Sequence, residues 1–165
     1  MEFVLQEGTD RILVFDASLA TLDGTITLSV PIDQPDFGAE WHKDPNSRGE
    51  GLLLLRNGHL LVLASWIVDP RSGVKSVNDL ACDDAGQLHL LSSKSRVIAR
   101  IDGHLVPEDG TAMVTAWELP DDLFAKHDDK AEGLVFAPPL GWLVALDLER
   151  EAPNVFPLSG VPRQL

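Results

Sequence analysis

Three short segments of the chain each open with a side chain that could bind a ligand or a metal ion. They begin at Glu50, Asn78 and Glu132. Each opening residue is followed by a small or acidic residue, a leucine and an apolar run, and then by a polar turn whose glycine lies 8 or 9 positions after the opening residue. A second apolar run follows the turn. The shared pattern predicts that the three opening residues occupy equivalent positions in structural repeats.

The residue types at these positions are those that hold a hard divalent cation. Asp79 directly follows Asn78, so the set offers carboxylates and an amide carbonyl, which are the oxygen ligands that calcium and magnesium prefer. Converging carboxylates repel one another unless a proton or a cation lies between them. We therefore predict a Ca²⁺ or other divalent metal site at Glu50, Asn78, Asp79 and Glu132, and no organic cofactor. The alternative is that these groups hydrogen-bond backbone atoms and bind no metal.

The elements that must position these residues are strands. Apolar bursts of four to eight residues are closed by Gly, Pro, Asn or Asp, at 11–15, 25–30, 52–55, 60–63, 88–91, 97–101 and 142–146. Such lengths are typical of strands rather than helices. The runs 52–55 and 60–63 are continuous, as expected for strands covered on both faces. Only residues 120–126 carry a helix signal, a proline followed by two acidic residues. The sequence predicts an all-β fold.

The spacing of the repeats indicates a radial arrangement of small sheets. The interval from Glu50 to Glu132 is 82 residues, which is two periods of 41. A second match, between the pair of strands in 3–14 and the pair in 88–99, has an offset of 85 residues. A four-stranded blade of a β-propeller takes about 40–50 residues. Both offsets therefore predict propeller-like blades.

The chain holds too few strands for a closed propeller. We predict one domain over 1–165, made of a partial blade at 1–30, a loop at 31–49 and blades at 50–77, 78–131 and 132–165. Four strands at 78–83, 87–92, 96–102 and 111–118 make the most complete blade. Three to four blades leave an incomplete ring with exposed sheet edges, which favour pairing. Dimerisation, another homo-oligomer or the missing blades of a longer chain would complete it.

The motifs Glu50-Gly51-Leu52, Asn78-Asp79-Leu80 and 130–134 resemble the inner-strand motifs of six-bladed β-propellers. The resemblance is to the phytase-like and NHL-like propellers and to the calcium-dependent lactonases, and the chain looks like a partial or truncated member. It covers most of 50–149 and, more weakly, 3–30. In the lactonases, Glu, Asn and Asp at the starts of inner strands hold a divalent metal in the central channel. The resemblance implies that role for Glu50, Asn78 and Glu132, with Asp79 beside them.

Other candidates for chemistry are weaker. His59 and His89 occupy equivalent places in the second strands of their repeats, which predicts a shared structural role. The charged run 126–132 could contribute to a site, although a solvated loop is the commoner use of such a run. Residues 92–95, Ser-Ser-Lys-Ser, contain the order Ser-x-Lys without the surroundings of a known nucleophile motif, so we predict a turn there.

The composition limits the partners. The chain has 13 basic and 26 acidic side chains, a net charge of −13, which argues against nucleic acid. Its single cysteine excludes an internal disulfide, and no apolar run reaches the about 20 residues that span a bilayer. The start of the chain lacks the basic region of a secretion signal, so a cytoplasmic location is the default expectation.

Two classes of function remain open at this point. The first, which we favour because the ring is incomplete, is a propeller-like protein that binds a small ligand or a protein partner at the channel or rim. The second is a divalent-metal-dependent hydrolase of lactone, ester or phosphoester substrates, in which the metal polarises the reacting oxygen and lowers the pKa of a bound water. The sequence identifies no catalytic residue.

Overall fold

The described residues form strands joined by turns and irregular segments, with one short turn of 3-10 helix, which confirms the all-β prediction for that part of the chain. The computed structural model describes residues 1–6, 8–28, 51–55, 58–63, 73–102, 113–124, 129–148 and 153–158. The predicted loop at 31–49 lies outside these ranges. The chain divides into two compact units, Met1–Ala64 and Ser65–Leu165. Within the described ranges, no helix is long and apolar enough to cross a membrane.

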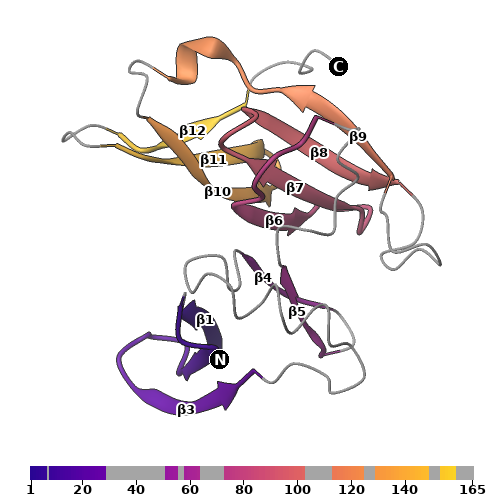
Figure 1. Cartoon of the computed structure of the whole chain (residues 1–165). Coiled ribbons are helices and arrows are strands. Elements are labelled where there is room, and N and C mark those ends of the chain that lie inside the picture. Colours follow the sequence, from indigo (N-terminus) through magenta and orange to yellow (C-terminus); the bar gives the residue numbers. More distant parts are fainter. Residues whose placement is uncertain are drawn as a thin grey trace. The chain divides into compact units, whose positions relative to one another are not determined.

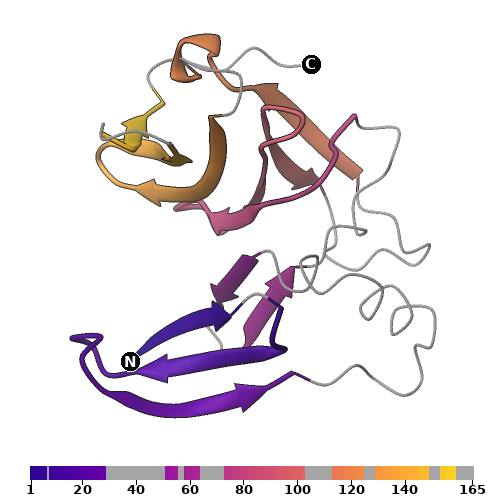
Figure 2. The ribbon, with the colours of Figure 1, turned by 60° about the vertical axis from the view of Figure 1, so that its left-hand side comes forward.

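The first unit holds a three-stranded sheet and a separate hairpin (Figure 2). The strands β1 (Glu2–Gln6), β2 (Arg11–Phe15) and β3 (Leu22–Thr27) pair antiparallel in chain order. Ile12 on the central strand is 1% exposed. These strands lie within the segment 1–30, where the sequence predicted a partial blade.

The hairpin consists of β4 (Gly51–Leu54) and β5 (Leu60–Leu63). Gly58 has a φ of 84°, and its amide donates to the Leu55 carbonyl at 2.9 Å, so a tight turn lies where the sequence predicted one. The prediction that both faces are covered is wrong for the described residues of β4, because Leu54 is 52% exposed. A continuous apolar run allows cover on both faces, but a second packing layer has to be present to provide it.

The second unit contains the longest continuous sheet (Figure 1). Its antiparallel strands, in spatial and chain order, are β6 (Asp79–Cys82), β7 (Leu88–Ser92), β8 (Val97–Asp102) and β9 (Met113–Glu118). All four lie where the sequence predicted strands. The β6–β7 turn is closed by Asp83, whose Oδ1 accepts from the Gln87 amide at 2.8 Å, and by Gly86 at a φ of 78°.

A three-stranded sheet lies against this one. It consists of β10 (Lys130–Ala137), β11 (Gly141–Asp147) and β12 (Val155–Pro157), and β10 contacts β6 and β7 (Figure 1). The core between the two sheets is apolar and includes Leu91, Ile98, Ala131 and Val144, each at most 3% exposed. The register of β10 against β11 shifts between Ala131 and Gly133, so Glu132 occupies a bulge.

The short helix predicted at 120–126 is present as a single turn, and residues 125 and 126 lie outside the described ranges. Residues Asp121–Leu123 form one turn of 3-10 helix after Pro120, with the Phe124 amide bonded to the Asp121 carbonyl at 3.1 Å. No side chain caps its first turn, so proline and early acidic residues support one turn and no more.

Candidate functional site

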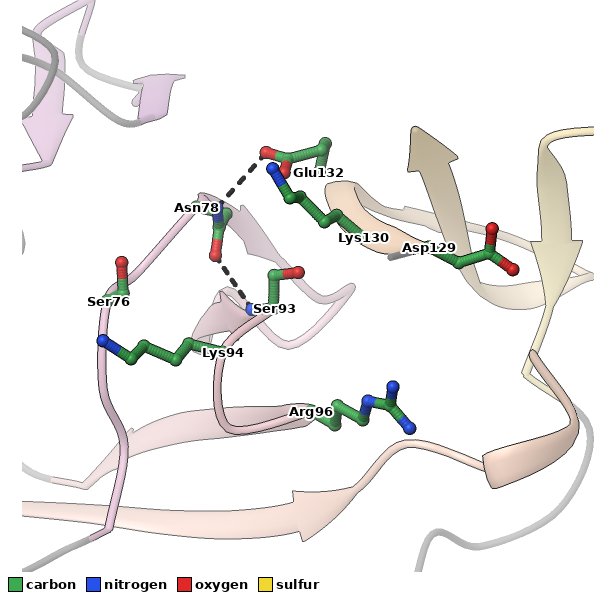
Figure 3. Close-up of a pocket in the computed structure, with 8 residues that line it drawn as sticks. All are labelled: Ser76, Asn78, Ser93, Lys94, Arg96, Asp129, Lys130 and Glu132. Carbon is green, nitrogen blue, oxygen red and sulfur yellow. Dashed lines mark hydrogen bonds between the residues drawn. The ribbon is translucent and has the colours of Figure 1, made fainter. Parts of the chain in front are cut away.

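Two of the predicted site residues meet directly. Asn78 immediately precedes β6 and Glu132 lies in the bulge of β10, and the Asn78 Nδ2 donates to the Glu132 Oε2 at 3.2 Å (Figure 3). These residues are 54 positions apart in the sequence. The openings of two repeats therefore converge, as the repeat pattern predicted for this pair.

Asn78 is held in place from a second direction. Its Oδ1 accepts a hydrogen bond from the Ser93 backbone amide at 2.8 Å, and the backbone amide of Asn78 donates to the Leu91 carbonyl at 2.8 Å. The Ser93 Oγ in turn accepts from the Ala131 amide at 3.1 Å. The start of β6, the turn after β7 and the start of β10 are thus joined by side-chain hydrogen bonds around one point.

Asp79 joins the two sheets of the second unit. Its Oδ1 accepts from the Leu80 amide at 2.8 Å and its Oδ2 from the Leu134 amide of β10 at 2.7 Å. Burial raises the pKa of the Asp79 carboxyl above its usual range, and the charge of Glu132 adds a smaller contribution in the same direction. Both carboxylate oxygens of Asp79 accept hydrogen bonds from backbone amides, so Asp79 has a structural role.

Gly133, the glycine of the Glu-Gly-Leu motif at 132–134, has a packing role in β10. A Cβ added to Gly133 would lie 3.1 Å from the Cβ of Ala145 on β11. That distance is tighter than an ordinary van der Waals contact, so one strand would have to shift. Glycine at this position allows β10 and β11 to approach closely beside the bulge that carries Glu132.

We expect Gly133→Ala to lower the free energy of unfolding by about 1–3 kcal/mol, the usual cost of overpacking a packed site. Urea denaturation followed by circular dichroism measures the change. Gly24→Ala is the control, because a Cβ added there meets nothing within 4 Å. Equal effects of the two substitutions would contradict the packing role of Gly133.

The bonded residues line a pocket of about 440 Å³. It is formed entirely by the second unit, and its lining side chains are all polar or charged (Figure 3). The neutral and acidic ones are Ser76, Asn78, Ser93, Asp129 and Glu132. Asp129 is 6% exposed and Glu132 accepts from Asn78, so both carboxylates are engaged with the protein.

Three cations complete the lining: Lys94, Arg96 and Lys130. Lys94 and Arg96 belong to the turn between β7 and β8, and Lys130 is the first residue of β10. The Arg96 guanidinium lies 4.3 Å from the centroid of the Phe124 ring, a cation–π contact that fixes its position. Sequence reasoning predicted the turn correctly but missed its cations. The sequence offered one signal for them: the turn carries two basic side chains, and the charged run 126–132 contains a third, Lys130.

The metal prediction lacks a ligand set among the residues that the structure describes. Asn78 and Asp79 have their oxygens bonded to backbone amides, and no three His, Cys, Asp or Glu side chains of the described ranges are grouped to hold an ion. Glu50 lies outside those ranges. The site at Glu50, Asn78, Asp79 and Glu132 therefore stays a prediction, and we derive no chemistry through a metal.

His59 and His89 do not share the role that their equivalent places predicted. His59 is exposed and precedes β5, whereas His89 lies within β7 and is 6% exposed. The His89 ring lies 4.5 Å from Trp142 and 6.3 Å from Trp117, between centroids. Burial lowers the pKa of His89, while contacts with Gln87 and Asp83 oppose that effect. It is a buried histidine beside two indoles and is not one of the residues that line the pocket.

Comparisons with known proteins give no further guide to the site. A scan against protein-family models, a search of curated proteins and a search of solved structures each found no match.

Proposed function

We propose that the chain is a β-propeller-like protein that binds a small polar ligand in the pocket at the starts of β6 and β10. The observation that carries the proposal is the pocket itself: about 440 Å³ of space lined by polar and charged side chains, of which hydrogen bonds hold Asn78, Ser93 and Glu132 in place. Ligand sites commonly have volumes of about 300–1,000 Å³ and a few convergent polar groups. The polar lining favours a hydrophilic ligand.

The propeller-like architecture is supported by the way in which the first strands of two successive sheets meet. In a propeller, the innermost strands of neighbouring blades lie side by side around a channel. β6 and β10 are each the first strand of their sheet, they contact one another, and Asp79 joins them. Completion of the ring by a second copy or by a longer chain remains our prediction. Sedimentation of the chain as a stable monomer would count against the first route.

A map of ligand-induced shifts in the NMR spectrum tests the binding proposal. We expect some members of a library of small polar compounds to shift the amide signals of 76–78, 93–96 and 129–132 selectively. Asn78→Ala should weaken that binding about tenfold, because losing a partly buried hydrogen-bonding side chain costs about 1–1.5 kcal/mol. Asn154→Ala is the matched control, since Asn154 is exposed and its carbonyl makes the bond to Leu146.

The outcomes separate the proposal from its alternatives. Shifts that fall outside the pocket, or no shifts at all, would contradict ligand binding at this site. A rise in melting temperature with millimolar calcium that Glu132→Gln abolishes would instead favour the metal-dependent hydrolase. That result would also require ligands beyond Asn78 and Asp79, whose oxygens are bonded to the backbone.

A further inference from the structure

Resting on the proposed function, we propose that the ligand carries an oxyanion, a carboxylate or a phosphate group, bound between Lys94, Arg96 and Lys130. The chain as a whole has a net charge of −13, yet its pocket is lined by three cations against two carboxylates. A positive pocket in an acidic protein attracts anions locally although the rest of the surface repels them. The carboxylates Asp129 and Glu132 already interact with the protein.

One hydrogen bond of the fold joins the two segments that carry the lysines. Lys94 follows Ser93 and Lys130 precedes Ala131, and the Ala131 amide donates to the Ser93 Oγ at 3.1 Å. Both lysines line the same pocket, so an anion bound there would be attracted by both charges. Neither lysine forms an ion pair with a carboxylate in the described part of the chain. Both side chains are exposed, so their charge is available to a ligand.

Arg96 adds a directional donor. Its contact with Phe124 holds the guanidinium at the pocket wall, and a cation–π contact uses no N–H group in a hydrogen bond to an acceptor oxygen. A guanidinium edge matches the paired oxygens of a carboxylate or phosphate. In Figure 3, Lys94 and Arg96 arise from the turn after β7, whereas the Lys130 side chain runs beside Glu132 and Asn78. The Asn78 and Glu132 side chains suit hydroxyl or amide groups of a ligand larger than a lone oxyanion.

The test uses inorganic phosphate and succinate as probes in NMR titrations at low ionic strength. We expect at least one of them to shift the signals of 93–96 and 129–132, and sodium chloride to weaken the binding. The double variant Lys94→Gln/Lys130→Gln should weaken it by about tenfold or more, the effect expected when charge-assisted contacts are lost. Preference for phosphate or for succinate identifies which oxyanion the site takes.

Lys75→Gln is the matched control, because Lys75 is an exposed lysine of the same unit that does not line the pocket. It should change the affinity by less than about twofold, as expected for an isolated surface charge. Equal weakening per charge removed, in the control and in the double variant, would overturn the proposal, since the effect would then be one of total charge. The oxyanion proposal would also be overturned if neutral compounds shift the amide signals of the pocket residues while phosphate and succinate do not. In that case the proposed ligand site would still stand. If no compound of either kind binds, both proposals fail.

Discussion

Replacing Asp79 by alanine should lower the free energy of unfolding by about 3 kcal/mol, because two backbone amides lose their acceptor in a single step. These amides belong to Leu80 and Leu134, whose side chains are both buried. A hydrogen bond to a charged acceptor contributes about 1.5–3 kcal/mol, and a donor left without a partner in the interior costs a similar amount. The Leu134 bond also joins the two sheets of the second unit, so its loss should loosen the contact between β6 and β10.

Chemical denaturation followed by circular dichroism measures this change. Asp84→Ala is the matched control, because Asp84 is an exposed aspartate five residues along the chain and should cost less than about 0.5 kcal/mol. Asp79→Asn should lower the free energy of unfolding by an intermediate amount. The asparagine side chain keeps one oxygen that can accept from a backbone amide, but its NH₂ group then faces the other backbone amide. A decrease of less than about 1 kcal/mol in the free energy of unfolding of Asp79→Ala would contradict the structural role of Asp79. It would mean that the two backbone amides lose their acceptor at almost no cost in stability.

The strands of this chain could be predicted because they depend on local patterns. Short apolar runs between turn residues specified β6 to β9, and the repeat spacing placed Asn78 and Glu132 in equivalent positions that meet in space. Periodicity fixes which segments are strands, and internal repeats fix which positions correspond. Neither prediction depends on contacts between residues far apart in the sequence, so both agree with the folded structure.

The chemistry of the site could not be predicted in the same way. Asp79 was expected to face a metal, but whether a carboxylate binds an ion or a backbone amide depends on the register of a strand that lies 55 residues away. The bulge at Glu132 shifts the register of β10 against β11 just before Leu134, and bulges leave little trace in a sequence. Lys94 and Arg96 were passed over because the turn that carries them has no motif. Their importance comes from the neighbouring Lys130 and Phe124, which only the fold brings near.

His89 makes the stability of the second unit depend on pH near neutrality. Burial against Trp142 and Trp117 lowers the pKa of His89 in the folded protein, whereas the unfolded chain has an ordinary histidine pKa of about 6.5. As the pH falls through about 6.5, the unfolded chain therefore takes up the proton more readily than the folded chain. The stabilisation is complete above about pH 6.5 and is lost as the pH falls toward the lower pKa of the folded state.

The charged groups around His89 act in opposite directions but leave this sign unchanged. The Asp83 carboxylate lies 4.0 Å from the Nδ1 and favours the protonated ring, as does the Gln87 carbonyl at 3.2 Å, while Arg100 disfavours it. Desolvation by burial is the largest influence on the pKa of His89, so that pKa remains lowered. Protonation would place a charge in the packed region that the neutral ring fills.

Stability curves of the wild type and of His89→Phe between pH 7.5 and 5.5 test this dependence. The wild type should lose stability as the pH falls across this range, and the variant should lose less, because phenylalanine keeps an aromatic ring there but cannot bind a proton. At pH 7.5 the variant should be less stable by about 1 kcal/mol, since the contact of the Nδ1 with the Gln87 carbonyl is lost. Parallel curves for the wild type and His89→Phe would show that burial of this ring does not couple folding to pH, and the acid sensitivity would then belong to the carboxylates.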